Sequence, residues 1–410
     1  MANNNDNKVL NVPPLRFPEF SGEWKMCTIG ELTTKVGSGV TPRGGEAVYK
    51  TEGHPFVRSQ NVGLGNLLLD DIAFIDEETH LRQKNTELQF NDVLLNITGA
   101  SIGRSALVDK QIVGGNVNQH VCIIRTKENL VPSFICSFLL SNYGQRQIDS
   151  FQAGGNRQGL NFEQIKSIKI TIPSKDEQIK IAKLLRAIDE RIATQNKIIE
   201  KLQSLIKGLN DHILKNIEGD QVCFADLGEA YGGLSGKSGD DFGCGDPFIT
   251  YMNVYQNTYI SENDYELVQI APDEKQNSVQ YGDALFTLSS ETPEEVGMGA
   301  VYLGKSQKLY LNSFCFGVHF HGNRVLPQYI AHFISSTSFR KAIYPLAQGS
   351  TRFNLQKQDF MRMKFVLPFL EEQKRIATAL DALYNHLANE KLLTEQYLLL
   401  KQYLLQQMFI

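Results

Sequence analysis

Apolar side chains recur at alternating steps of four and three residues in the middle of the chain, between positions 175 and 215. This spacing is the heptad pattern of a coiled-coil helix. A helix of roughly 40 residues spans about 60 Å, at about 1.5 Å per residue. The pattern has one polar interruption, Gln195, and its apolar positions are Ile181, Leu185, Ile188, Ile192, Ile199, Leu202, Ile206, Leu209 and Ile213. We therefore predict a long spacer helix in the centre of the sequence.

A second heptad run lies at the C-terminal end of the sequence, with Glu390 at its polar position and Ile376, Leu380, Leu383 and Leu387 as its apolar positions. Further along, Thr394 and Lys401 weaken the seam, while Leu393 and Leu400 lie beside it. Neither helix has a partner seam nearby in sequence, and the two polar interruptions coincide. We therefore expect the helices to pair antiparallel near their centres. The alternative is two solvent-facing helices that each dock on their own domain.

The sequence contains an internal repeat with an offset of 195 residues. Self-similarity at a fixed distance indicates that one structural unit has been used twice. Each copy has a proline suited to the first position of a helix, and later an apolar-proline pair ahead of Glu-Gln and the heptad run. The matching positions are Pro132 with Pro327, Ile172-Pro173 with Leu367-Pro368, Glu177-Gln178 with Glu372-Gln373, and Gly154 and Arg157 with Gly349 and Arg352.

Each repeat contains a globular domain that combines strands and helices. Short runs rich in β-branched residues, at 93–98, 121–125 and 168–172, alternate with turn-rich loops, and an amphipathic helix follows each matching proline. The predicted fold class is α+β, with two mixed α/β domains in tandem repeat separated by two long coiled-coil helices. We expect an N-terminal extension at 1–23, globular domains at 24–173 and 217–368, a central helix at 174–216 and a C-terminal helix at 369–410.

Composition excludes several classes of protein. With 42% apolar residues among 410, the chain has material for more than one core and is globular. The start is Asn-rich, and no run reaches the roughly 18 apolar residues of a membrane span, so we expect a cytoplasmic protein. The six cysteines are scattered, with no Cys-x-x-Cys pair and no histidine at zinc-ligand spacing. We therefore expect reduced thiols and no metal site.

The charge distribution does not suit a protein that holds DNA by itself. The formal net charge is -4, and residues 217–368 carry 11 Lys or Arg against 17 Asp or Glu, whereas residues 24–173 carry 15 against 14. A protein that held a duplex by counterion release alone would be more basic. Either DNA is not the ligand, or another subunit supplies much of the phosphate contact.

Four polar segments of the first globular domain carry side chains suited to nucleic acid. The segment 58–61 follows a strand, where arginine can fork onto guanine and an amide can pair with adenine. The segment 96–104 is a small-residue loop whose amides can approach a phosphate, and 118–120 and 154–161 are further polar loops. Each loop alone also fits an ordinary turn. The candidate contacts are Arg58, Ser59, Gln60, Asn61, Asn96, Thr98, Ser101, Arg104, Asn118, Gln119, His120, Arg157 and Gln158.

Together with the repeat and the two heptad runs, these segments make the whole sequence resemble the specificity subunits of type I restriction-modification systems. The resemblance covers essentially the entire chain, and the order of two domains and two helices is more specific than any one motif. It implies two target-recognition domains that each read one half of a split double-stranded DNA site, and no catalytic residue in this chain. The motifs that carry it include Leu15-Arg16-Phe17-Pro18-Glu19-Phe20 with Trp24, Gly37-Ser38-Gly39 with Thr41-Pro42, the four polar segments, and Ile172-Pro173 leading into Glu177-Gln178.

The same resemblance implies partners. The helices would dock two methylation subunits, restriction subunits would complete the complex, and the partners would supply the missing phosphate contacts. We expect no cofactor in this chain, and S-adenosylmethionine, ATP and Mg in the partner subunits. The expected subunit-interface residues are Ile181, Leu185, Ile188, Ile192, Ile199, Leu202, Ile376, Leu380, Leu383 and Leu387.

The second globular domain repeats the scaffold but not the polar side chains. Thr250 and Met252 stand where the first has Arg58 and Gln60, and an acidic stretch, 289–295, replaces the small-residue loop. The two domains should therefore read different bases, which gives an asymmetric bipartite site. The candidate contacts in this domain are Thr250, Tyr251, Asn253, Ser289, Ser290 and Arg352.

Three short motifs resemble catalytic signatures but fail on context. The stretch 232–238 is one residue short of a phosphate loop and no apolar helix follows it, 242–245 is stopped by Pro247, and Val12 breaks an Asn-Pro-Pro methylation motif at 11–14. Two rival hypotheses remain. A single-chain DNA methyltransferase would transfer methyl groups by itself, and a coiled-coil scaffold or adaptor would show no sequence-selective DNA binding with any partner.

Overall fold

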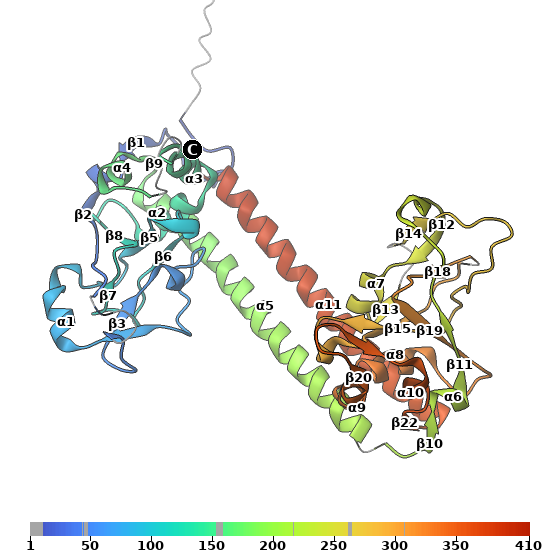
Figure 1. Ribbon diagram of the computed structural model, residues 1–410. Helices are drawn as coiled ribbons and strands as arrows, with labels where there is room; N and C mark the ends of the chain where they lie inside the picture. The colour runs from blue at the N-terminus through green and yellow to red at the C-terminus, as the bar shows by residue number, and fades with distance from the viewer. Residues whose placement is uncertain are drawn as a thin grey trace, which may run out of the picture. The chain divides into compact units, whose positions relative to one another are not determined.

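The computed structural model describes residues 11–42, 44, 48–152, 159–215, 217–260, 265–306 and 308–410. Contacts divide the chain into a first unit, Met1–Asn196 with Leu392–Ile410, and a second unit, Lys197–Lys391. Two long helices, α5 (Lys175–Lys215) and α11 (Leu370–Gln407), contribute residues to both units (Figure 1). The mixed helix and strand content of each unit confirms the predicted fold class.

Among the described residues of the first unit, the globular part contains three sheets of short strands. The largest has the order β2-β8-β5-β6, built from Thr33–Ser38, Val121–Thr126, Val93–Asn96 and Ser105–Leu107. The second has the order β4-β3-β7, from Ala73–Ile75, His54–Val57 and Asn116–Val117. The third pairs β1 (Lys25–Thr28) with β9 (Lys169–Ile172). Strand β5 is buried along its whole length, as expected for a continuous apolar run.

The described part of this globular domain also contains the short helices α1 (Glu77–Arg82), α2 (Pro132–Leu140), α3 (Asn142–Ser150) and α4 (Phe162–Ser167). Helix α2 begins at Pro132, as the sequence predicted, because proline needs no hydrogen-bond acceptor at the first helical position. Its Phe134 and Phe138 are fully buried, and the ring of Phe409 lies 5.1 and 6.2 Å from theirs. The end of α11 is thereby anchored in the core of the first unit.

The second unit repeats this plan with more strands. Its main sheet has the order β11-β19-β15-β17-β13, from Gly228–Gly232, Cys315–Phe320, Ala284–Thr287, Gly299–Tyr302 and Tyr259–Ile260. Three smaller sheets are β14-β12-β18 (Glu266–Val268, Phe242–Ile249, Tyr310–Leu311), β16-β21-β20 (Ser289–Ser290, Phe353–Leu355, Ala347–Gln348) and β10-β22 (Asp220–Cys223, Lys364–Leu367). The helices are α6 (Phe224–Leu227), α7 (Tyr251–Gln256), α8 (Pro327–Ile334), α9 (Thr337–Ile343) and α10 (Lys357–Met361).

The apolar seams of the two long helices are covered by this chain. In the first unit, Ile181, Leu185 and Ile188 of α5 are at most 7% exposed and share one buried cluster with Leu404 of α11 and Phe409. In the second unit, Ile376 and Leu380 of α11 belong to the core, and Leu209 and Ile213 of α5 pack against it. The end of α11 therefore docks on the domain that it does not follow in sequence. This contradicts the alternative in which each helix docks only on its own domain.

This burial corrects part of the expected subunit interface. Ile181, Leu185, Ile188, Ile376, Leu380 and Leu387 are buried within their own unit, so their side chains are not on a surface that another subunit can contact. The remaining predicted interface residues, Ile192, Ile199, Leu202 and Leu383, are half-buried.

Two further expectations concern ligands and membranes. Within the described ranges, no helix combines the length and apolar character that crossing a bilayer requires. Among the same residues, no group of three or more His, Cys, Asp or Glu side chains is placed to hold a metal ion. All six cysteines are free thiols, three of them buried.

Candidate nucleic-acid interface

The first polar edge, defined as segments 58–61, 96–104 and 118–120, is assembled around buried asparagines. Segment 58–61 turns directly after β3, and the turn is closed by Asn61, whose Oδ1 accepts a hydrogen bond from the Arg58 backbone N at 2.9 Å. Its Nδ2 donates to the backbone oxygen of Leu68 and to Oδ1 of Asp71, both at 2.8 Å. With 0% exposure and every described polar contact inside the domain, Asn61 shapes the turn.

A second asparagine joins this turn to the next segment. Asn96, at the end of β5, is fully buried, and its Nδ2 donates to the backbone oxygen of Ser59 at 2.8 Å and to Oγ of Ser101 at 3.1 Å. The third, Asn118, is 7% exposed and accepts a hydrogen bond from the backbone N of His120 at 3.0 Å. These amides therefore donate or accept hydrogen bonds inside the protein, although Oδ1 of Asn96 is buried without a hydrogen-bond partner among the described residues.

These three side chains correct the sequence prediction. Asn61, Asn96 and Asn118 are interior groups that set the shape of the edge, and we leave them out of the proposed DNA contacts. The exposed members of the edge are Gln60, Arg104 and Gln119, while Ser59, Thr98, Ser101 and His120 are half-buried. Arg157 and Gln158 lie outside the described residues.

Arg58 and Gln60 both donate hydrogen bonds to Asp71, and Nη2 of Arg58 lies 3.4 Å from its carboxylate. Nη2 of Arg58 donates to the backbone oxygen of Asp71 at 2.7 Å, and its guanidinium lies 5.4 Å from the ring centre of Tyr49. Nε2 of Gln60 also donates to the Asp71 carboxylate. Arg58 is therefore held in place by its neighbours, which is the condition for a precise contact, and Gln60 is the more accessible of the two.

Segments 96–104 and 118–120 are joined by a hydroxyl-imidazole pair. Oγ1 of Thr98 lies 2.6 Å from Nδ1 of His120, and the backbone N of Ile97 donates to the backbone oxygen of His120 at 3.0 Å. Thr98 also forms a β-bridge with Gly159, which brings the end of the fourth predicted segment to the same place. The structure thus gathers segments that lie up to a hundred positions apart in the sequence.

The second polar edge, defined as segments 250–253, 287–297, 312–314 and 349–354, repeats two of these hydrogen bonds. Oδ1 of Asn253 accepts from the Thr250 backbone N at 2.8 Å, as Asn61 does from Arg58. Oδ1 of Asn312 accepts from the Phe314 backbone N at 2.9 Å, as Asn118 does from His120. The backbone scaffold of the edge has therefore been duplicated, and Asn312 and Phe314 are its members that the sequence prediction missed.

A signal for these two residues was present. Asn312-Ser313-Phe314 repeats the spacing of Asn118-Gln119-His120 ahead of a buried strand, with an asparagine two positions before a ring. An aromatic residue beside a strand is usually counted as core, whereas Phe314 is 54% exposed.

Several predicted DNA contacts of the second domain are instead buried or hydrogen-bonded within the protein. Ser289 and Ser290 form strand β16 and are 5% and 6% exposed. The Tyr251 hydroxyl donates to the backbone oxygen of Ser289 at 2.8 Å, and burial raises the pKa of Tyr251. Thr250 and Asn253 cap the first turn of α7. Of the predicted contacts in this domain, Arg352 is the one whose side chain is exposed. The prediction that Ser289 and Ser290 face DNA is therefore corrected.

The acidic loop of the second edge is held by a half-buried arginine. The guanidinium of Arg340 donates at 2.6 to 2.7 Å to the backbone oxygens of Glu294, Val296 and Gly297. Burial lowers the pKa of Arg340. The side chain stays charged because the ordinary pKa of arginine is far above neutral pH. At the same repeat position in the first unit, Nε2 of Gln145 donates to the backbone oxygen of Gly103 at 3.1 Å. Sequence reasoning missed both positioning residues.

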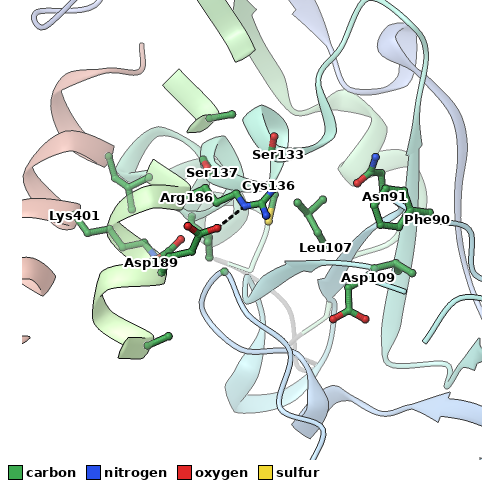
Figure 2. A pocket seen from close by; sticks show the side chains of 17 residues that line it. Phe90, Asn91, Leu107, Asp109, Ser133, Cys136, Ser137, Arg186, Asp189 and Lys401 are labelled. Atoms are coloured by element: carbon green, nitrogen blue, oxygen red, sulfur yellow. Dashed lines mark hydrogen bonds and ion pairs between the residues drawn. The ribbon is translucent and has the colours of Figure 1, made fainter. Parts of the chain in front are cut away.

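One cavity of about 420 Å³ in the first unit is lined by residues of α2, α5 and the end of α11 and by Gly65. Figure 2 shows Asp189 and Lys401 on its helical side and Leu107 and Asp109 across from them. Nζ of Lys401 lies 2.6 Å from Oδ1 of Asp189 and 3.1 Å from the backbone oxygen of Leu64. Burial raises the pKa of Asp189 despite this ion pair. Lys401 therefore ties both helices to the loop that follows the first polar segment.

Comparison with known proteins identifies a family. The family model described as "Type I restriction modification DNA specificity domain" matches residues 21–204 and 237–396. The chain is 23% identical over 397 residues to the type I restriction enzyme EcoKI specificity subunit of Escherichia coli (strain K12), covering 88% of this chain and 82% of that protein. It is 21% identical over 405 residues to the type I restriction enzyme MjaX specificity subunit of Methanocaldococcus jannaschii, covering 92% and 90%. The crystal structure of a type I restriction-modification system S subunit from M. genitalium shares the fold with a TM-score of 0.57 at 13% identity, covering 97% and 99%.

Proposed function

Because this chain belongs to the type I restriction modification DNA specificity domain family, its role is sequence-specific DNA recognition, and we propose that each unit reads one half of a bipartite target. The observation that carries the proposal is the duplicated edge. The same asparagine-to-backbone hydrogen bonds shape both edges, yet their exposed side chains differ. Gln60, Arg104 and Gln119 are exposed on the first edge, and Met252, Phe314 and Arg352 on the second. One scaffold with two sets of exposed groups gives an asymmetric site.

We assign the chemistry to partner subunits. In this proposal methylation subunits bind S-adenosylmethionine and modify adenine, and restriction subunits use ATP and Mg, while this chain is non-catalytic and works in the cytoplasm. The near-balanced or acidic charge of the two globular domains supports the assignment, because the phosphate contacts must then come from elsewhere.

The docking surface that fits a methylation subunit is an apolar face on the last part of α11. Leu392, Leu399 and Tyr403 fall on one face of the helix and are 54%, 65% and 54% exposed, with Leu400 beside them at 43%. Exposed apolar clusters of this kind mark protein interaction sites. These leucines lie next to the buried seam and were not among the predicted interface residues.

Replacing Leu399 with glutamate is expected to weaken co-purification of the methylation subunit at least tenfold, because it places a charge in the apolar contact. The measurement is pull-down at matched expression. Leu398→Glu is the control, because Leu398 precedes Leu399, is 46% exposed and lies on a different side of the helix. Equal recovery with both variants would remove this face from the interface.

The direct test of the proposed function is co-expression with the neighbouring methylation subunit, followed by mapping of methylated adenines on genomic DNA. We expect one bipartite motif whose halves differ. Methyl transfer by the purified chain alone would support the methyltransferase alternative, and absence of any motif with the partner present would support the scaffold alternative.

The isolated chain is expected to bind duplex DNA weakly and without useful selectivity. The acidic excess of the second globular domain opposes phosphate contact, and the partners that would wrap the duplex are missing. A gel-shift titration of the chain alone, with the mapped target and a scrambled duplex, measures this. Tight, site-selective binding without partners would overturn the assignment of phosphate contacts to other subunits.

Substituting Gln60 with alanine is expected to cost about 1 to 3 kcal/mol of discrimination at one half of the target and to leave the other half unchanged. Gln60 is exposed on the first edge and has a side-chain amide of the kind that pairs with adenine. Gln89→Ala is the control. Gln89 is exposed in the same domain but lies before the start of β5, whereas Asn96 of the polar edge lies at the end of that strand. Equal loss in both half-sites would make the role of Gln60 structural.

A further inference from the structure

Phe314 is a large apolar side chain at a fixed and exposed position on the second polar edge. Its backbone N donates to Oδ1 of Asn312 at 2.9 Å, and its backbone oxygen accepts from Leu288 at 2.8 Å. Residue Cys315, which follows it, begins the buried strand β19. The backbone is therefore rigid while the ring stays 54% exposed, a combination that exposes apolar surface to water unless a ligand covers it.

The guanidinium of Arg352 lies over this ring, 5.6 Å from its centre. Arg352 belongs to the tight turn between β20 and β21, and β21 pairs with β16 of the same edge. The turn depends on Gly349, whose φ is 138° and where an added Cβ would lie 2.1 Å from the Arg352 backbone oxygen. Two segments of the edge thus bring the Phe314 ring and the Arg352 guanidinium into cation–π contact.

The surroundings of this pair suit base edges better than phosphates. The neighbouring acidic loop carries Glu291, Glu294 and Glu295, and these carboxylates repel a phosphate. A phenyl ring has no donor for a phosphate, but it can pack on the C5-methyl group of thymine in the major groove. An arginine held over a ring can fork onto O6 and N7 of guanine.

We propose that Phe314 and Arg352 are the specificity-determining pair of the second unit, with Phe314 packing on a thymine methyl group and Arg352 donating to a guanine beside it. The proposal rests on the proposed function and adds to it the bases that the second half-site must contain. At the same backbone position the first unit has His120, whose imidazole is engaged with Thr98. Because the first unit has histidine and the second has phenylalanine at this matching position, the two half-sites should differ at the base that this position contacts.

The test uses the complete complex with methylation subunits and its mapped target. Duplexes in which single thymines are replaced by uracil lack only the methyl group, and duplexes with 7-deazaguanine lack only N7. The wild-type complex is expected to bind about five- to tenfold more weakly to one uracil duplex and one deazaguanine duplex, both changed in the same half-site. Phe314→Ala is expected to abolish the thymine-uracil difference, and Arg352→Ala the guanine-deazaguanine difference.

Controls separate this proposal from the function on which it rests. Phe369→Ala removes an exposed ring of the second unit outside the edge and should keep both differences. Phe314→His introduces the first unit's residue if the alanine variant fails to assemble. A half-site without thymine or guanine, or a Phe314→Ala complex that still distinguishes thymine from uracil, overturns the proposal while a bipartite motif persists. Loss of all sequence selectivity in the wild-type complex would instead contradict the proposed function.

Discussion

The Ile188→Asp variant is expected to lose several kcal/mol of stability in the first unit and to assemble poorly with methylation subunits. Ile188 is 7% exposed on α5 and belongs to the buried cluster that includes Leu404 and Phe409. An unpaired carboxylate there loses its hydration without gaining a partner, and the end of α11 loses its apolar support.

Urea unfolding followed by intrinsic fluorescence, together with pull-down by the methylation subunit, measures both effects. Ala187→Asp is the matched control, because Ala187 is the preceding residue of the same helix and is exposed. If both variants unfold at the same urea concentration and co-purify equally, the seam assignment fails.

A fragment of residues 1–216 is expected to form a two-fold symmetric dimer that directs methylation to an interrupted palindrome. The fragment keeps the first globular domain and α5 but lacks α11, whose end covers the seam in the complete chain. Two copies can bury the exposed seam by antiparallel pairing of their α5 helices, which is favourable at about 25 cal/mol per Å² of apolar area. Such a dimer has two copies of the first edge and none of the second.

The ion pair between Asp189 and Lys401 sets a limit on this dimer. The repeat offset places Ile206 of the second copy where Lys401 stands in the complete chain, so Asp189 would be covered without its cation. Since breaking a partly buried pair is costly, Ile206→Lys is expected to tighten the fragment dimer, and Leu205→Lys, at an exposed neighbour, is not.

Light scattering on the fragment and methylation mapping in cells that express it with the methylation subunit test both steps. A monomeric fragment would contradict the helix-pairing argument. A dimer that still methylates the asymmetric parental site would contradict the assignment of one reading edge to each unit.

The long helices and the repeat were predictable because their signals are local. The heptad spacing predicted a helix over 175–215, and α5 has these bounds. Pro132 and Pro327 marked the first residues of α2 and α8, where the fixed backbone angle of proline favours a helix start. Signals of this kind do not depend on which segments meet in space.

The direction of individual polar side chains was not predictable. An asparagine at a strand end serves equally well to close a turn or to read adenine, and Asn61 and Asn96 close turns. On α11 the usual pattern is reversed, since Thr394 is buried and Lys401 is paired with Asp189, while leucines next to them are exposed. Whether each of these residues is buried or exposed depends on which segment it packs against. The spacing of residues in the sequence does not give that information.

The central claim is that the two units read opposite halves of one target, and site-specific crosslinking tests it most directly. Gln119 and Ser313 are exposed at matching positions of the two edges, one residue before His120 and Phe314. A photoreactive side chain is placed at one or the other in the complete complex, and the crosslinked bases are mapped on the methylated target. We expect Gln119 to crosslink only within one half-site and Ser313 only within the other. Crosslinks from both positions to the same half-site would contradict the account.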